Sequence, residues 1–334
     1  MRRQTALELR MVDMARETRA ENVTKPNFFI VGAAKCGTTS LFEYLRQHPE
    51  VFLSKVKEPY FFGSDLALAP YWGIHNEADY LALFADTGGA KRIGEASVWY
   101  LYSTTAAREI KAFNPSARII IMVRNPVDVL YSLHGQFLRS YNEDIVSFEE
   151  ALDAEEDRRS GARIPDSAHF PRGLIYREVV RFSAQVERYF DVFGRDNVFV
   201  VVFDGFSKDT AAVYERVLQF LDIDSTFRAD LKLYNKSMPI YIRPSLRYWK
   251  TRPRLRRRID MLMTSYPRRL VGKLIDSMAR PLDRPPKMDT KTRARLLQEF
   301  AEEIDSLGRL LNRDLSHWHN PPAARRRTDI PHPS

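Results

Sequence analysis

The chain has 334 residues, of which 44% are hydrophobic and 12% aromatic, so it has enough apolar side chains to build a core. This composition excludes a globally disordered chain. The formal net charge of +9 favours an anionic partner, such as a nucleotide, an acidic glycan, a nucleic acid or an anionic membrane. The single cysteine, Cys36, excludes an intrachain disulfide and fits a reducing compartment.

The N-terminal residues alternate charged and single apolar side chains, in a polar arm that we expect to span residues 1–26. They contain no continuous apolar run of the kind found in a secretory signal. Nowhere does the sequence show an apolar stretch long enough to span a membrane. We therefore expect a cytoplasmic protein.

A strand followed by a loop and a helix is the first predicted unit of structure. Residues 28–31 form a short apolar run before Gly32, which predicts a buried strand. Apolar residues at helical spacing then predict a helix over 40–47.

The same order of strand and helix recurs further along the chain. Residues 118–123 are almost wholly apolar, as expected of a strand covered on both faces, and Pro126 suits the first turn of a helix. Residues 198–203 predict another strand, preceded by a helix over 175–193 and followed by one over 208–221. This alternation predicts an α/β fold, a P-loop-like central parallel β-sheet with helices on both faces.

The C-terminal part differs in composition from the rest. Arginines alternate with Leu, Met and Ile over residues 242–287, which we expect to be a basic insertion or cap on a single domain spanning 27–318. A last amphipathic helix is predicted over 290–311. The tail, 319–334, is rich in Pro and Arg and is expected to be disordered.

The loop after the first strand has the composition of a phosphate-binding loop and reads GAAKCGTTS over residues 32–40. Glycines let the backbone approach an anion, and the amides and dipole at a helix start favour negative charge. Thr38, Thr39 and Ser40 add hydroxyl donors, and Lys35 adds a positive charge. The competing interpretation is a glycine-rich turn with a solvated lysine.

The position of the lysine separates this loop from one that binds a triphosphate. The P-loop pattern G-x-x-x-x-G-K-[ST] has lysine after its second glycine. Here threonine, Thr38, follows the second glycine, Gly37, and the lysine, Lys35, lies two residues before Gly37. The loop instead resembles the K-x-G-T-T/S signature of sulfotransferases that use 3′-phosphoadenosine-5′-phosphosulfate (PAPS).

A second anion contact is predicted after the strand over 118–123. Arg124 ends that strand, and an arginine there can form a paired contact with a phosphate. Ser132 lies two helical turns later on nearly the same face. The pair suits a 3′-phosphate, while the competing interpretation is a strand cap plus an ordinary helix serine.

From about Phe28 to Trp318 the chain resembles the sulfotransferase superfamily, and within it the heparan-sulfate sulfotransferase branch and its bacterial relatives. The resemblance implies that Arg124 and Ser132 bind the 3′-phosphate of PAPS. It also implies that the 5′-phosphosulfate is bound by the loop residues Lys35, Cys36, Gly37, Thr38 and Thr39, and we expect Ser40 to contribute to donor binding.

The sequence KEPYFF over residues 57–62 resembles the family's acidic-then-aromatic segment, which implies that Glu58 is the catalytic base. Without that resemblance, Glu58 is interpreted as a surface glutamate. Heparan enzymes often have histidine where this chain has Tyr60, and the 3-O-sulfating enzymes have a lysine near the position of Ala96. These differences weaken the transfer of a heparan substrate to this chain.

Two further donor contacts are implied by the resemblance. Residues 235–241 resemble the segment before the adenine site, so Tyr241 is interpreted either as stacking on adenine or as a core tyrosine. The family's K-G-R loop, which follows a disulfide hairpin, is absent. Arg284 or Lys287 is expected to replace it.

The resemblance therefore implies a PAPS-dependent sulfotransferase. It would transfer a sulfuryl group, by in-line displacement, to a hydroxyl or amine of its acceptor. The acceptor would be a carbohydrate or glycan-like molecule, such as a glycan or glycolipid. Lys35 and Glu58 would be its catalytic residues. No metal is expected, because the histidines lack metal-ligand spacing. The alternative is a P-loop nucleotide kinase that uses ATP and Mg²⁺, against which the position of Lys35 counts.

The arginine-rich segment 243–284 has several interpretations. It is interpreted as a solvated cap over the site, as a contact for an anionic acceptor, or as a basic amphipathic helix at a membrane surface. Binding to nucleic acid is the interpretation we do not expect.

Overall fold

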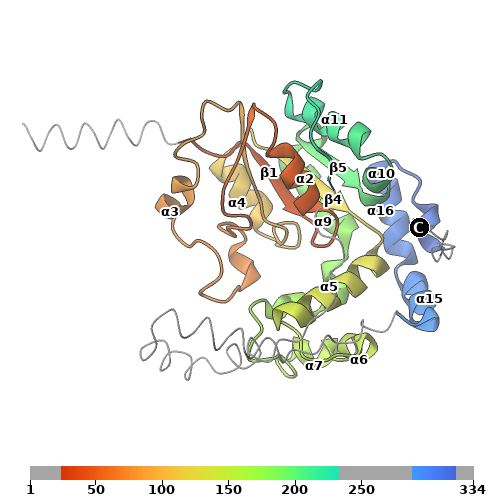
Figure 1. The fold of residues 1–334 in the computed structure, drawn as a ribbon. Coiled ribbons are helices and arrows are strands. Elements are labelled where there is room, and N and C mark those ends of the chain that lie inside the picture. Colours follow the sequence, from red (N-terminus) through yellow and green to blue (C-terminus); the bar gives the residue numbers. More distant parts are fainter. Residues whose placement is uncertain (1–23, 233–287, 321–334) are drawn as a thin grey trace, which may run out of the picture. The chain divides into compact units, whose positions relative to one another are not determined.

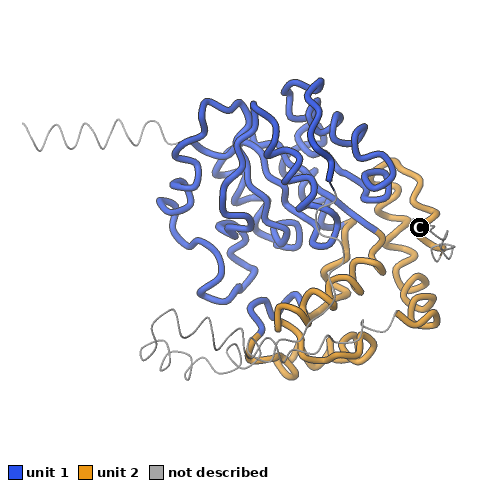
Figure 2. The backbone as a smooth tube through the Cα atoms, in the orientation of Figure 1, with its two compact units in different colours: residues 1–124, 168–173, 184–238 blue, residues 125–167, 174–183, 239–334 orange. Residues whose placement is uncertain are grey.

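The computed structural model describes residues 24–232 and 288–320. The chain divides into two compact units, shown in different colours in Figure 2. Unit 1 comprises residues 1–124, 168–173 and 184–238, and unit 2 comprises residues 125–167, 174–183 and 239–334. The basic segment 242–287 and most of the predicted arm and tail lie outside the described residues, so the predicted domain organisation stays a prediction.

Unit 1 contains a five-stranded sheet in the order β2-β3-β1-β4-β5, in which all neighbouring strands are parallel. Figure 1 shows helices on either side of this sheet. The predicted P-loop-like α/β fold, with a central parallel sheet and helices on both faces, is confirmed. The strands are β1 (Phe28–Gly32), β2 (Val51–Leu53), β3 (Arg92–Ala96), β4 (Arg118–Val123) and β5 (Val198–Val202).

The central strands are apolar because both of their faces are covered. All five residues of β1 are buried, as are the last five of β4. Gly94 of β3 makes room for the Phe28 ring of β1, since a Cβ at position 94 would lie 2.4 Å from that ring. The core of unit 1 therefore requires a glycine within a strand.

The helices of unit 1 follow the strands along the chain. α2 begins directly after the loop that leaves β1, and α10 directly follows β5. They are α2 (Thr38–Leu45), α3 (Glu77–Ala82), α4 (Ala106–Phe113), most of α9 (Phe182–Phe193), α10 (Phe203–Lys208) and α11 (Thr210–Leu221).

Unit 2 is helical in its described part. A buried ion pair joins Arg158 to Glu143 at 2.8 Å, and Tyr176 donates a hydrogen bond of 2.9 Å to the same glutamate. The helices are α5 (Pro126–Ser140), α6 (Phe148–Asp153), α7 (Glu155–Arg159), α8 (Tyr176–Val179), α15 (Thr290–Glu299) and α16 (Ala301–Leu311).

Several predicted boundaries were wrong. The predicted helix over 175–193 is two helices, α8 and α9, and the one over 290–311 breaks at Phe300 between α15 and α16. Apolar spacing continues across Phe300, so periodicity alone does not reveal this break. β5 ends at Val202, and the next residue already begins α10.

None of the helices in the described ranges combines the length and the apolar character that crossing a bilayer requires.

Candidate active site

Three predicted site residues of unit 1 follow the carboxyl ends of parallel strands. Lys35 lies in the loop after β1, Glu58 in the loop after β2, and Arg124 directly after β4. Backbone hydrogen bonds tie two of these loops to neighbouring strands: Ala33 N–H donates to Met122 O at 2.7 Å, and Glu58 N–H donates to Ala96 O at 2.9 Å. This edge is where open α/β sheets bind their ligands.

In the phosphate loop, residues 33–37, two residues adopt a left-handed backbone conformation before α2 begins. Lys35 has φ 66° and Gly37 has φ 94°. Gly37 precedes the first residue of α2, and no side chain caps the start of that helix. The backbone N–H groups of a helix's first turn have no partner within the helix, so those at Thr38 and Thr39 suit an anion.

Lys35 and Arg124 both lie close to Cys36. Burial of the Cys36 thiol raises its pKa to about 12, and the charges of Arg124 and Lys35 oppose that rise. The thiol is fully buried and donates to Ala34 O at 3.4 Å, so Cys36 can contact a donor only through its backbone. Two cations thus converge on one loop.

The guanidinium of Arg124 also packs on an aromatic ring. It lies 4.8 Å from the centroid of Phe203, the first residue of α10. The same ring lies 3.1 Å from the position that a Cβ on Gly37 would occupy. Phe203 therefore contacts both the phosphate loop and the arginine, a role that the sequence did not indicate.

The remaining predicted donor contacts lie on α2, in unit 2 and outside the described residues. Ser132 lies on α5 with a partly exposed side chain, and it belongs to unit 2. Its pairing with Arg124 stays a prediction. Ser40, also partly exposed, lies in the first turn of α2. Tyr241 and Lys287 lie outside the described residues.

Glu58 is held by contacts at both of its carboxylate oxygens. Lys57 Nζ lies 2.7 Å from Oε1, and the Tyr60 hydroxyl donates to Oε2 at 2.7 Å. The Glu58 side chain keeps 30% of its surface exposed, so a substrate can reach it. An oriented, accessible carboxylate is the arrangement that a general base requires.

Glu95, near the end of β3, is a second carboxylate that sequence reasoning did not select. It is fully buried and accepts hydrogen bonds from Tyr80 at 2.8 Å, Tyr100 at 3.0 Å and Ser97 at 2.8 Å. Burial raises the pKa of Glu95 to about 7, although the three hydroxyl groups oppose that rise. A glutamate followed closely by serine and tyrosine was the only sequence signal.

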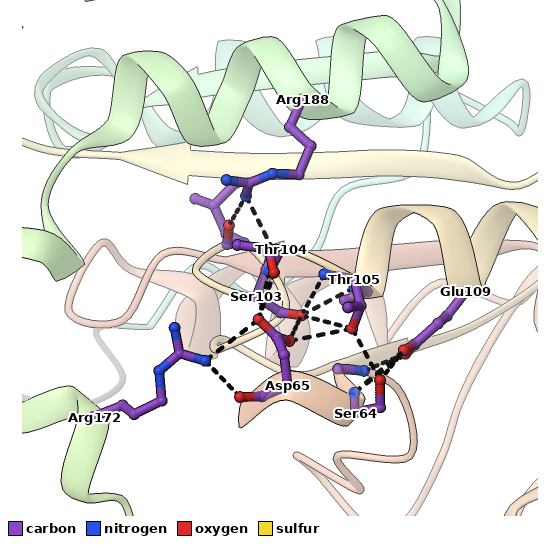
Figure 3. A network of polar contacts seen from close by, with 11 residues as sticks. Ser64, Asp65, Ser103, Thr104, Thr105, Glu109, Arg172 and Arg188 are labelled. Atoms are coloured by element: carbon purple, nitrogen blue, oxygen red, sulfur yellow. Dashed lines mark hydrogen bonds and ion pairs between the residues drawn. The ribbon is translucent and has the colours of Figure 1, made fainter. Parts of the chain in front are cut away.

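A polar network anchors the chain beyond the Glu58 segment (Figure 3). Asp65 accepts from the Thr104 backbone at 2.9 Å and from the hydroxyl groups of Ser103, Thr104 and Thr105. Glu109 accepts the Gly63 N–H at 2.6 Å. These bonds join the loop after β2 to the start of α4.

Within residues 24–232 and 288–320, no three His, Cys, Asp or Glu side chains form a group that could hold a metal ion.

Comparison with known proteins identifies the family. The model of the sulfotransferase domain matches residues 25–240. The chain belongs to this family. It is also similar to the crystal structure of a sulfotransferase from Alicyclobacillus acidocaldarius, with 31% identity and a TM-score of 0.66 over 89% of this chain and all of the other.

Two similar human proteins are carbohydrate sulfotransferases. Carbohydrate sulfotransferase 15 is 34% identical over 34% of this chain and 28% of its own length. Heparan sulfate glucosamine 3-O-sulfotransferase 6 is 34% identical over 34% of this chain and 31% of its own length. The chain thus spans less than a third of each of these relatives. The predicted resemblance to the heparan-sulfate branch and its bacterial relatives is confirmed, and nothing supports the nucleotide kinase alternative.

Proposed function

We propose that the protein transfers a sulfuryl group from PAPS to a hydroxyl or amine of a carbohydrate acceptor. The observation that carries this proposal is that Lys35 follows β1 and Arg124 follows the neighbouring strand β4, where the Phe203 ring packs against both Arg124 and Gly37. Two cations beside a helix start suit a ligand that carries two separate phosphate groups.

In the proposed reaction, the acceptor oxygen or nitrogen attacks the sulfur of PAPS. The bond between sulfur and the 5′-phosphate oxygen breaks, and adenosine 3′,5′-bisphosphate leaves with the electron pair. Lys35 stabilises the charge that grows on the leaving oxygen, as preorganised cations do in phosphoryl transfer. Arg124, with Ser132, binds the 3′-phosphate.

Glu58 takes the proton that the acceptor loses. Its contacts with Lys57 and Tyr60 orient the carboxylate, as a general base requires. Tyr241 and Lys287 lie outside the described residues, so their roles in binding the donor stay predictions from the resemblance.

A carbohydrate acceptor is supported by the names of the relatives, which act on carbohydrate and on heparan sulfate glucosamine. The net charge of +9 favours an acidic glycan among carbohydrates. The proposed acceptor is therefore an anionic glycan.

The test is transfer of labelled sulfate from PAPS to a panel of acidic glycans, neutral glycans and small phenols. We expect transfer to acidic glycans, nearly abolished in Lys35→Ala and in Glu58→Gln, since loss of a general base costs about 10²- to 10⁴-fold in rate. Lys91→Ala removes an exposed lysine that pairs with Asp222 at the amino end of β3, whereas the site residues follow the carboxyl ends of the strands, and it serves as the control. Transfer to phenols alone would overturn the carbohydrate assignment.

A further inference from the structure

Glu95 is a buried carboxylate whose partners are all neutral. Its three donors are the hydroxyl groups of Tyr80, Tyr100 and Ser97, and no basic side chain in the described part of the chain forms an ion pair with it. A buried charge without a counter-ion is costly unless hydrogen bonds satisfy it. A position that only needed polar packing would be filled at lower cost by a neutral residue.

A chain of hydrogen bonds runs from Glu95 to Glu58. The Ser97 hydroxyl donates to Glu95 Oε2 at 2.8 Å and accepts the backbone N–H of Tyr60 at 3.3 Å. The Tyr60 hydroxyl then donates to Glu58 Oε2 at 2.7 Å. Because serine has one hydroxyl proton, its donation to Glu95 leaves a lone pair for the Tyr60 N–H.

Residues 58–60, where this series of hydrogen bonds ends, have a strained backbone that needs support. Glu58 has φ 63° and Tyr60 has φ 47°, both in the left-handed region that costs energy for residues with a side chain. Such a conformation persists only where the surroundings hold it. The Glu58 N–H donates to Ala96 O and the Tyr60 N–H donates to the Ser97 hydroxyl, and these two bonds supply that support from the end of β3.

We propose that Glu95 is a positioning residue for Glu58. In its ionised form it orients the Ser97 hydroxyl, Ser97 holds the backbone of Tyr60, and Tyr60 holds the carboxylate of Glu58. The inference rests on the proposed function, in which Glu58 is the catalytic base.

Protonation of Glu95 would disturb this series of hydrogen bonds. A neutral carboxyl carries its own proton and can donate it to the Ser97 oxygen. The serine hydroxyl can then turn its own proton toward the Tyr60 N–H, and two facing protons repel each other. The pKa of Glu95, about 7, places this change near neutral pH.

The other titratable groups around Glu95 stay neutral in that range. They come from the loop after β2, from α3, from the segment after β3 and from α9. Burial raises the pKa of each well above 10: Tyr60, Tyr80, Tyr100 and Tyr189. Glu58 is the nearest other carboxylate in the chain of bonds, and it is separated from Glu95 by Tyr60 and Ser97.

The test is the pH dependence of kcat for sulfuryl transfer from PAPS, from about pH 5.5 to about pH 9. For the wild type we expect an inflection near pH 7, below which kcat falls. Glu95→Gln should lower kcat at high pH by roughly 10- to 100-fold, as expected for a displaced catalytic group, and should remove that inflection. The affinity for adenosine 3′,5′-bisphosphate should not change.

Tyr80→Phe gives a second, milder test that keeps the ring and removes one hydroxyl from Glu95. Since that hydrogen bond favours the ionised carboxylate, its loss raises the pKa of Glu95. The inflection should therefore move to higher pH, with kcat above it changed by less than about twofold. An inflection that stays in place in Tyr80→Phe overturns the inference, even if Glu95→Gln fails to fold.

Glu109→Gln is the matched control, because Glu109 also accepts bonds from the loop after β2 but does not contact Tyr60 or Ser97. It should lower stability and keep the inflection. Equal losses of kcat in Glu95→Gln and Glu109→Gln, with both inflections retained, would reduce Glu95 to a structural role.

Absence of transfer by the wild type overturns the proposed function and this inference with it. Normal transfer with an unchanged profile in Glu95→Gln overturns only the role of Glu95.

Discussion

The guanidinium of Arg124 packs on the ring of Phe203, with 4.8 Å between the guanidinium carbon and the ring centroid. Gly37 approaches the same ring so closely that a Cβ there would lie 3.1 Å from it. The first residue of α10 thus fixes Arg124 and the phosphate loop against each other. Donor affinity should depend on this ring, although it need not touch the donor.

Phe203→Leu is therefore expected to weaken binding of adenosine 3′,5′-bisphosphate by about 2- to 30-fold, since a cation–π contact contributes roughly 0.5–2 kcal/mol. Isothermal titration calorimetry measures this change. Phe199→Leu is the control, because Phe199 lies on β5 and stacks on Phe220 instead. Equal affinities for the wild type and Phe203→Leu would show that the ring does not position Arg124.

Tyr60→Phe removes the hydroxyl that donates to Glu58 and keeps the buried ring. We expect kcat to fall by about tenfold, because the carboxylate loses a charge-assisted hydrogen bond that orients it. Steady-state kinetics should show little change in the KM for PAPS. Tyr214→Phe removes a buried hydroxyl that bonds to Tyr44 O and should leave kcat unchanged. A normal kcat in Tyr60→Phe would argue against the orientation of Glu58 by Tyr60.

The network around Asp65 predicts a pH-dependent contribution to stability (Figure 3). Partial burial opposes ionisation, but hydrogen bonds from Ser103, Thr104 and Thr105 outweigh it and lower the pKa of Asp65 from 3.8 to about 2. A carboxylate whose pKa is lower in the folded state stabilises the fold above its ordinary pKa. That stabilisation is lost as the pH falls toward about 2.

Asp65→Asn should therefore lower the free energy of unfolding by roughly 1 kcal/mol at neutral pH, a value discounted for the partial exposure of the carboxylate. The difference from the wild type should be constant from about pH 5 to about pH 8 and shrink below about pH 4. Urea unfolding at several pH values measures it. A difference that persists unchanged at about pH 2.5 would contradict this account.

The buried pair in unit 2 predicts a larger loss of stability. Arg158 and Glu143 both have fully buried side chains, and Glu143 also accepts from Tyr176. Arg158→Ala leaves the carboxylate without its counter-ion and should cost about 3–5 kcal/mol in urea unfolding. Tyr176→Phe keeps the ion pair and should cost less. Similar losses in the two variants would mean that the ion pair contributes little beyond an ordinary hydrogen bond.

The sequence predicted the strands β1, β4 and β5, and it missed the neighbouring strands β2 and β3. β4 has the predicted bounds because it is a long apolar run, whereas β3 went unpredicted because Gly94 and Glu95 interrupt its apolar pattern. Gly94 makes room for the Phe28 ring, and Glu95 accepts hydrogen bonds from three hydroxyl groups. In a sequence, a buried charged residue cannot be distinguished from an exposed one, because its hydrogen-bond partners are not known.

The site shows the same division. Lys35 was predicted from the chemistry of its loop, while Glu58 was indicated only by the family resemblance. The links from Glu95 to Glu58 join loops after β2 and β3, which lie far apart in the sequence and meet because β3 lies between β2 and β1. Strand order of this kind is not set by any local pattern.

The most direct test of the sulfotransferase assignment compares three nucleotides by calorimetry: adenosine 3′,5′-bisphosphate, adenosine 5′-monophosphate, and ATP with Mg²⁺. The account predicts that the bisphosphate binds the wild type most tightly. It also predicts that Arg124→Ala removes most of the bisphosphate's advantage over the monophosphate, since Arg124 is assigned to the 3′-phosphate. Tighter binding of ATP with Mg²⁺ than of the bisphosphate would contradict it.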